Sequence, residues 1–239
     1  LGVALLKAIV VKGTKPIPQA DPAGMKKVGT DDLREVHDID KRTGWSIQST
    51  NGVLAWCNEV AALPVRNFRK THHPDAWKCD GERLNNARIA TYGCPNCTMR
   101  CGITIHDEAG RESELDYENV GLLGPNLEIF DLPQIGTLNY QCDDYGIDTM
   151  SGGCVLSFYA DAIDHGAAPG DLRFGDSAGF KKVLTSIALR QGEIGNLLAD
   201  MMQGAGGSTG VGELALKHAH SDRILPLSIF GRWEATNAS

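Results

Sequence analysis

The sequence predicts a mainly α-helical fold, a multi-helix domain with a short β segment at its N-terminus. In the second half of the chain, apolar residues recur at helical spacing, the first three of four such runs begin at a residue that caps helices, and glycine follows most of the runs. The connections between these runs are short. Successive capped helices joined in this way form a mainly helical domain.

The N-terminal segment predicts one strand and one exposed helix. Residues 6–12 (LKAIVVK) are rich in β-branched side chains and precede a glycine, which is typical of a strand ending in a turn. The proline-containing stretch that follows indicates a loop or a domain junction. Asp21 and Pro22 then form a good helix start, because aspartate caps and proline is tolerated in the first turn. We expect a polar, exposed helix from there to about Asp40.

Two further helices are expected before the middle of the chain. One covers roughly residues 52–62, and the other covers residues 82–91 and leads into a cysteine-rich turn. The segment between them begins with LPVRNF (63–68) and continues as a long polar loop. His72 and His73 lie in this loop, but adjacent side chains diverge and rarely bind one ion, so a solvated loop is the favoured interpretation.

The second half of the chain holds four predicted helices. They run from Asp131 to Gly146, from Ser151 to Gly166, from Asp176 or Ser177 to Gly192, and from Ile194 to Met202. The first begins with a capping-box arrangement, in which proline and glutamine follow the capping aspartate at the expected positions. The glycine-rich stretch after Gly204 fits neither nucleotide-binding glycine pattern and follows a helix, so it is interpreted as a flexible connection.

Composition excludes several classes of protein. The chain has 239 residues, of which 42% are hydrophobic and 22% charged, which argues against intrinsic disorder. Its net charge of −7 argues against a nucleic-acid or acidic-membrane binder. No apolar run approaches the ~20 residues that span a bilayer, and the first residues lack a signal-peptide layout. We therefore expect a cytoplasmic protein without a membrane span, and the missing initiator methionine suggests a piece of a longer chain.

Three closely spaced cysteines are the chemical centre of the sequence. Four of the seven cysteines are scattered, whereas Cys94, Cys97 and Cys101 form a C-x2-C-x3-C pattern. A disulfide framework would spread an even number of cysteines along a short secreted chain. Thiolates are soft ligands that suit iron–sulfur clusters and zinc, and the flanking glycines allow the backbone to bend around a bulky group. The trio therefore predicts a metal site.

Several interpretations of this trio compete. A zinc site would need a second ligand pair further along the chain, and no such pair is present. A redox dithiol would need a thioredoxin-like setting and leaves Cys101 unexplained. Three plain structural cysteines are the simplest alternative. A [4Fe–4S] cluster with its fourth ligand elsewhere is favoured.

Several segments together resemble the aldehyde ferredoxin oxidoreductase family, whose members are tungsten (sometimes molybdenum) bis-pterin enzymes. The segments are LKAIVVKGTK (6–15), LPVRNF (63–68), CPNCTMRCG (94–102), ELDYENVGLLGPNLEIFDL (114–132), CDDYGIDTMSGG (142–153) and GEIGNLLADMMQG (192–204). The resemblance implies the end of an N-terminal pterin-binding β domain at 1–20, a helical domain with the cluster turn at 21–150 and the start of a third, helical domain at 151–204. Residues 205–239 stay unassigned.

The resemblance also implies roles for individual residues. Cys94, Cys97 and Cys101 match the ligands of a [4Fe–4S] cluster, whose fourth cysteine lies far downstream in the family. A pterin-binding motif of the form D-x-x-G-[LI]-D matches Asp143, Gly146, Ile147, Asp148 and Thr149. Glu118 matches a glutamate near the metal, where a buried carboxylate with a raised pKa would move a proton or orient water. At Thr137, where some members carry a glutamate for an inter-subunit metal, this chain has no ligand.

The implied activity is the oxidation of small aldehydes to carboxylates, with electrons passing through the cluster to ferredoxin or another iron–sulfur carrier. The enzyme would be a homo- or hetero-oligomer. Two other functions stay open. One is the tungsten subunit of an aromatic acyl-CoA reductase, and the other is a zinc-stapled helical interaction module.

Overall fold

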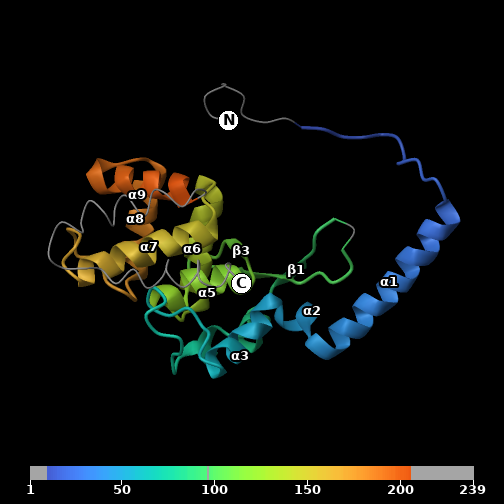
Figure 1. Ribbon diagram of the computed structural model, residues 1–239, viewed down its shortest axis with the longest axis horizontal. Coiled ribbons are helices and arrows are strands. Elements are labelled where there is room, and N and C mark those ends of the chain that lie inside the picture. Colours follow the sequence, from blue (N-terminus) through green and yellow to red (C-terminus); the bar gives the residue numbers. More distant parts are fainter. Residues whose placement is uncertain (1–9, 96, 206–239) are drawn as a thin grey trace, which may run out of the picture.

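Helices form most of the molecule, as predicted, in a computed structural model that describes residues 10–95 and 97–205 (Figure 1). The α-helices are α1 (Pro22–Thr43), α2 (Trp45–Gln48), α3 (Val53–Glu59), α4 (Gly81–Asn86), α5 (Tyr117–Leu123), α6 (Leu132–Tyr145), α7 (Thr149–Asp164), α8 (Ser177–Ala188) and α9 (Gly192–Ala205). Short 3-10 turns η2 (Thr50–Gly52), η3 (Ala76–Cys79) and η4 (Pro125–Leu127) connect some of them. None of the described helices is both long enough and apolar enough to cross a membrane.

Within the described residues, the strands form one antiparallel sheet, in the order β1 (Ala90–Tyr92), β2 (Gly102–His106) and β3 (Glu112–Leu115). Of the strand predicted at 6–12, only residues 10–12 are described, and they are exposed and lie outside any strand. The glycine-rich connection predicted after Gly204 lies almost entirely outside the described residues. The mainly helical class is therefore confirmed, while the observed sheet lies in the middle of the chain.

Three helix starts were predicted from capping aspartates, and the structure confirms them. The side chains of Asp21, Asp131 and Asp176 each accept a hydrogen bond from the backbone N–H three residues further on, at 3.0, 3.1 and 2.9 Å. Such bonds satisfy backbone donors that a helix leaves free at its first turn. The helix predicted from Ser151 begins slightly earlier, because Asp148 is its cap.

The helix predicted at 82–91 is wrong in its second half. α4 ends at Asn86, and residues 90–92 form β1 instead. These residues pair with β2 in a register that places Ala90 opposite Thr104 and Tyr92 opposite Gly102. Their conformation is therefore set by a partner ten or more residues away, which overrides local helical preference.

The core lies between the sheet and the later helices. β3 and β2 pack on α6, and α6 packs on α7 and α8. Phe180, Leu138 and Leu156 are completely buried at these contacts. This arrangement fixes the end of α6 and the start of α7 relative to the sheet, and the candidate site lies on this part of the molecule.

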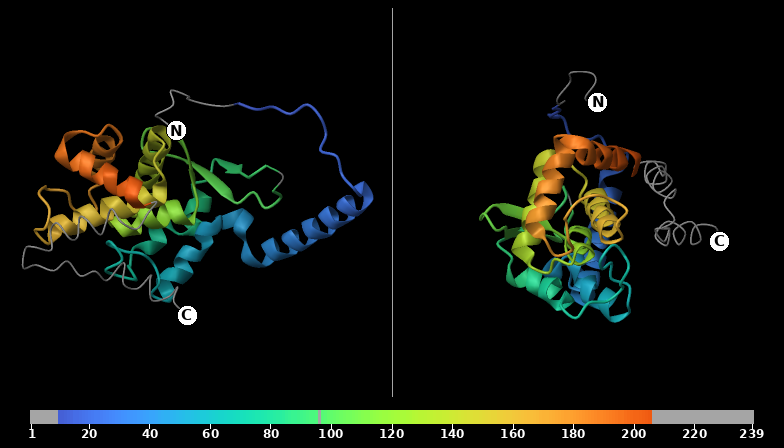
Figure 2. Two further views of the ribbon diagram at one scale, coloured as in Figure 1. Left: turned by 45° about the horizontal axis from the view of Figure 1, so that its top comes forward. Right: turned by 90° about the vertical axis from the view of Figure 1, so that its left-hand side faces the viewer.

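α1 extends away from this body, and the exposed chain before it turns back from the far end of α1 toward the rest of the molecule (Figures 1 and 2). None of its residues is buried, which confirms the predicted exposed helix. It ends at Gly44, whose φ of 68° is left-handed and whose backbone N–H donates to the Asp40 carbonyl.

The segment predicted as the start of a polar loop contains a strained turn. Arg66, Asn67 and Phe68 all have left-handed backbones, with φ of 50°, 54° and 58°. Such conformations cost energy for residues other than glycine and persist only where the surroundings hold them. Here the Asn67 side chain donates to Asp161 on α7 at 3.1 Å, and Arg66 forms ion pairs with Glu128 and Asp164. The turn therefore ties this loop to α7.

Two buried glycines, Gly153 on α7 and Gly121 on α5, predict opposite effects. A Cβ at Gly153 would lie 2.7 Å from the Leu122 carbonyl oxygen, whereas a Cβ at Gly121 would meet nothing closer than 3.8 Å. Gly153→Ala is therefore expected to lower the free energy of unfolding by about 1–3 kcal/mol, as measured by urea unfolding. Gly121→Ala is the matched control and should be neutral or stabilising, because alanine favours helix. Equal losses for the two variants would contradict this packing.

Candidate functional site

The three cysteines lie on the hairpin that joins β1 to β2, which projects from the body of the molecule (Figure 1). The Cys97 backbone N–H donates to the Cys94 carbonyl at 3.0 Å, which closes a turn between the first two cysteines. At the base of the hairpin the two arms approach closely, since a Cβ at Gly93 would lie 2.8 Å from Cγ of Arg100. Glycine is needed there for the arms to meet.

All three thiols are free. Cys94 and Cys97 are exposed, and Cys101 is half-buried at the start of β2. Burial, together with the negative charges of Cys97 and Asp116, raises the pKa of the Cys101 thiol. Within the described residues, no three histidine, cysteine, aspartate or glutamate side chains converge as a metal-binding group. Three cysteine thiols on one hairpin fit the soft donor set that iron–sulfur clusters and zinc both take.

The predicted pterin-binding residues form the corner between α6 and α7. Gly146, with φ 67°, ends α6, and its N–H donates to the Asp143 carbonyl. The Asp148 carboxylate accepts from the Ser151 N–H at 2.7 Å and caps α7. Ile147 packs against the core cluster. Of the other two predicted residues, Thr149 lies near Asn119 on α5, and Asp143 accepts a hydrogen bond from Asn139 of its own helix.

Asn139 of α6 joins this corner to the sheet. It is almost fully buried, at 1% exposed. Its Nδ2 lies 3.0 Å from both the Ser113 hydroxyl and the Glu114 carbonyl on β3, and 3.2 Å from the Asp143 carboxylate. One side chain thus fixes the end of α6 against β3.

Asn119 of α5 extends the same network. Its Nδ2 donates to Oδ1 of Asn139 at 2.5 Å and approaches Oγ1 of Thr149 at 3.4 Å. The start of α7 is thereby connected to α5 through a side chain in the predicted DYEN segment. Sequence reasoning missed both asparagines. The only signal for Asn139 is a polar residue on the apolar side of α6.

Four carboxylates lie around this network: Glu114, Asp116, Glu118 and Asp143. Burial, then the negative charge of Glu118, raises the pKa of Asp116. Burial, then the charges of Asp116 and Asp143, raises the pKa of Glu114. Partial burial also raises the pKa of Asp143. Because Glu114, Asp116 and Asp143 are partly desolvated, and Glu114 and Asp116 also lie near other negative charges, these three groups hold protons more readily than isolated carboxylates do.

The expectation for Glu118 needs one correction. The resemblance implied a buried carboxylate, but Glu118 is exposed in the first turn of α5. Asp116, immediately before that helix, is the partly buried acid whose pKa is raised. Asp116 is the single residue between β3 and α5 and is half-buried there, whereas Glu118 lies exposed in the first turn of α5.

The cysteine hairpin and the helix corner meet at these carboxylates. Gly102, which follows Cys101, carries no side chain, and a Cβ there would collide with the Glu114 carboxylate. The negative charge of Asp116 raises the pKa of the Cys101 thiol, and the negative charge of Asp143 raises the pKa of Glu114. The base of the hairpin and the end of α6 therefore border one carboxylate-lined face.

Because the pKa of Asp116 is raised in the folded protein, replacing this charged side chain by a neutral one should stabilise the fold, and more so at higher pH. Between the pKa of the unfolded chain and the higher pKa of the folded chain, the folded state binds more protons, so stability falls as pH rises through this window. Asp116→Asn is expected to raise the free energy of unfolding at pH 7.5 by roughly 0.5–1 kcal/mol, and by less at pH 4.5.

Urea unfolding at the two pH values measures this effect. Asp32→Asn, an exposed aspartate on α1, is the control and should change little at either pH. Loss of stability in Asp116→Asn at pH 7.5 would contradict the proposed desolvation and repulsion.

The chain is similar to known proteins over most of its described length. The family model described as "Aldehyde ferredoxin oxidoreductase, domains 2 & 3" matches residues 18–220. A tungsten-containing aldehyde ferredoxin oxidoreductase of Thermococcus kodakarensis is 29% identical over 210 residues, which cover 84% of this chain and 34% of the relative. A protein of the same description from Pyrococcus furiosus is 30% identical over 184 residues, covering 76% of this chain and 30% of the relative.

A third relative carries a different description. The "aliphatic sulfonate oxidoreductase, WOR-like subunit" of Pyrococcus furiosus is 28% identical over 218 residues, covering 84% of this chain and 34% of that protein. The chain thus spans about a third of the length of these curated relatives. Among solved structures, a chain of the BamBC active-site complex of benzoyl coenzyme A reductase is similar over 59% of this chain and 22% of the length of that chain. The TM-score is 0.45 and the sequence identity is 24%.

Proposed function

Because the chain belongs to the aldehyde ferredoxin oxidoreductase family, of which it matches domains 2 and 3, we propose that it is part of a tungsten-pterin oxidoreductase. That enzyme would oxidise aldehydes to carboxylates and pass the electrons through a [4Fe–4S] cluster to ferredoxin or a similar carrier. The observation that carries the proposal is the shared face of the cysteine hairpin and the α6–α7 corner. A redox enzyme of this kind needs its electron relay near its metal carrier, and the base of the hairpin, next to Cys101, borders the same carboxylates as the end of α6, which supports this proposal.

The cysteine hairpin would hold the cluster. Cys94, Cys97 and Cys101 are the proposed ligands, and the fourth would come from a part of the protein outside the described residues. Each thiol would bind as the thiolate, and the positive iron would offset the burial and the neighbouring charge that raise the pKa of Cys101.

The α6–α7 corner would hold the pterin. Asp143, Gly146, Ile147, Asp148 and Thr149 are the proposed binding residues. The carboxylate of Asp143 and the backbone groups freed around Gly146 suit a flat heterocycle rich in hydrogen-bond donors. Bound there, a tungsten pterin supplies two-electron redox chemistry and polarises the oxygen that the aldehyde gains.

Oxidation of an aldehyde with one water yields a carboxylate, three protons and two electrons, so the site must also move protons. Glu118 is the proposed catalytic carboxylate, as its match to the family glutamate implies. Asp116 beside it has a raised pKa and is suited to pass protons on.

In the domain division that follows, residues 1–20 end a pterin-binding β domain, 21–150 carry the cluster, 151–204 begin the third domain and 205–239 stay unassigned. The complete enzyme would be a cytoplasmic homo- or hetero-oligomer.

The test is anaerobic isolation of the complete protein that contains this chain, from cells supplied with tungstate. We expect tungsten, iron and acid-labile sulfide, a brown colour with absorbance at roughly 400 nm, and aldehyde-dependent reduction of a viologen dye. If the protein contains iron and tungsten but acts only on an aliphatic sulfonate, or only on an aromatic acyl-CoA, that compound class would take the place of aldehydes as the substrate. Colourless protein containing zinc alone would overturn the proposal and favour the zinc-stapled module.

A further inference from the structure

The two arms of the cysteine hairpin meet at one contact beyond their last paired residues. The ladder between β1 and β2 ends at the pair Tyr92 and Gly102. On the loop side of this pair, a Cβ at Gly93 would lie 2.8 Å from Cγ, 3.1 Å from Cα and 3.2 Å from Cβ of Arg100. Because Gly93 has no side chain, the aliphatic part of the Arg100 side chain packs directly on the opposite arm.

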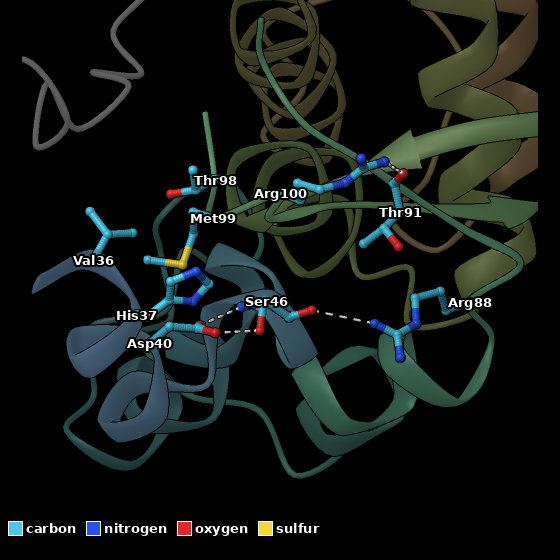
Figure 3. Close-up of a pocket in the computed structure, with 9 residues that line it drawn as sticks. All are labelled: Val36, His37, Asp40, Ser46, Arg88, Thr91, Thr98, Met99 and Arg100. Atoms are coloured by element: carbon cyan, nitrogen blue, oxygen red, sulfur yellow. Dashed lines mark hydrogen bonds between the residues drawn. The ribbon is translucent and has the colours of Figure 1, made fainter. Parts of the chain in front are cut away.

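The Arg100 side chain also forms a hydrogen bond across the hairpin. Its Nη2 donates to the Thr91 carbonyl at 3.1 Å, and Thr91 belongs to β1 (Figure 3). A hydrogen bond from a charged donor is stronger than one between neutral groups. Arg100 is thus joined to the β1 arm twice, by its packing on Gly93 and by this bond.

The backbone of Arg100 is strained. Its φ of 48° lies in the left-handed region, which costs free energy for a residue with a long side chain and persists only where the surroundings hold it. Glycine and asparagine adopt this conformation more readily than arginine does. The turn alone would therefore be formed with less strain by another residue, which indicates that this position depends on the arginine side chain.

The contact lies between the first and the third cysteine. Cys94 follows Gly93 in the chain and Cys101 follows Arg100, so each of these cysteines is one residue away from the point where the arms touch. The hydrogen bond from the Cys97 N–H to the Cys94 carbonyl closes a turn within the loop. Within the described residues, the three thiols do not converge as a metal-binding group. A metal would therefore have to draw them together, and arms that are already joined have less conformational freedom to lose.

The geometry points to Arg100 as a positioning residue of the cysteine turn, which keeps the arm of Cys94 against the arm of Cys101 so that a metal meets a partly formed site. This inference rests on the proposed function, because it takes the three cysteines as metal ligands. It adds a residue that neither the spacing of the cysteines nor the family resemblance assigns to the site.

The first test is an anaerobic titration of the 239-residue chain with Co²⁺, whose absorption reports bonds to thiolates. Arg100→Asn should bind Co²⁺ at least about fivefold more weakly, because asparagine suits the left-handed backbone but is too short to reach Thr91. Arg100→Lys keeps the aliphatic chain and a donor, and its affinity should lie between those of Arg100→Asn and the wild type. Gly93→Ala should weaken binding about tenfold or more, because its methyl group would push the arms apart.

Arg190→Asn is the matched control. Arg190 is also an exposed arginine with a left-handed backbone, of φ 50°, and its side chain bonds to another segment, through Asp200 at 2.8 Å. It lies between α8 and α9, outside the hairpin, so this variant should bind Co²⁺ like the wild type. Urea unfolding should show the hairpin variants to be as stable as the wild type, because the hairpin projects from the body of the molecule. A loss of affinity would then report on the cysteine turn.

A metal-free measurement separates this inference from the proposed function. It uses the double variant C97S/C154S, in which the other cysteines outside the reactive pair are buried. Exchange with oxidised glutathione converts the thiols of Cys94 and Cys101 to a disulfide and releases two molecules of reduced glutathione. The equilibrium gives the effective concentration of one thiol at the other. Adding Arg100→Asn should lower this concentration about fivefold.

The outcomes distinguish the two ideas. Equal Co²⁺ affinity in the wild type and Arg100→Asn, with thiolate absorption in both, would overturn the role of Arg100 and leave the cysteines as ligands. A wild-type chain that binds no Co²⁺ through thiolates would count against the ligands themselves. The glutathione equilibrium would then decide alone, and an effective concentration unchanged by Arg100→Asn would overturn the inference.

Discussion

Cys97→Ser in the complete, anaerobically isolated protein is expected to remove most of its iron and to lower aldehyde-dependent dye reduction at least ~10²-fold. Changes to groups that merely support metal ligands already cost 10–100-fold in metal affinity or activity, and loss of a ligand costs no less. Cys97 is exposed on the hairpin, away from the core. Its replacement by serine should therefore leave the free energy of unfolding within about 0.5 kcal/mol of the wild type, so a loss of iron would report on ligation and not on folding.

Cys154→Ser is the matched control. Cys154 is also a free, exposed cysteine, but it lies on α7 and belongs to no cysteine cluster. We expect this variant to keep its iron, its sulfide and its activity. Full iron content in Cys97→Ser would contradict ligation by the trio, and loss of iron in Cys154→Ser would make that thiol a cluster ligand.

The helices could be predicted because their signals are local. Asp21, Asp131 and Asp176 each cap a helix through a hydrogen bond to a backbone N–H only three residues away. Gly146 ends α6 because glycine readily adopts the left-handed φ of 67°. Such signals depend on neighbours in sequence and therefore appear in the sequence itself.

The sheet could not be predicted in the same way. Its register, such as Ile103 opposite Leu115, joins segments that contain few alternating apolar residues. β1 has only three residues, too few for a periodic pattern, and it was taken for the end of a helix. Pairing across the hairpin decides its conformation, and that pairing is a property of the folded chain.

In the candidate site, too, the features that depend on local sequence could be predicted, and those that depend on tertiary packing could not. The spacing of Cys94, Cys97 and Cys101 is a local pattern, and it predicts a candidate metal site at this turn from the sequence alone. The role of Asn139 depends on four elements meeting, and the partial burial of Asp116 depends on how β3 leads into α5. For the same reason Glu118 was expected to be buried but is exposed. Burial of a polar group is set by tertiary packing, which spacing does not report.

Asn139→Ala is expected to have the largest effect on stability among the site variants. The side chain is 1% exposed, and its removal would leave the Ser113 hydroxyl, the Glu114 carbonyl and Oδ2 of Asp143 without this donor. Leaving buried polar groups unpaired costs about 1–3 kcal/mol for each group that water cannot reach. We expect a loss of roughly 2–4 kcal/mol in the free energy of unfolding, measured by urea denaturation.

The same variant tests whether Asn139 positions the proposed pterin corner. Asn58→Ala is the matched control, because Asn58 also ties two segments through side-chain hydrogen bonds, to the backbone of His73, but lies away from the corner. Both variants should be less stable than the wild type. In the complete protein, measured well below either unfolding midpoint, only Asn139→Ala should lose tungsten, since it alone frees the end of α6 from β3. Equal tungsten content in the two variants would show that Asn139 stabilises the fold without positioning the corner, and the carboxylate-lined face would then lose its link to the cofactor.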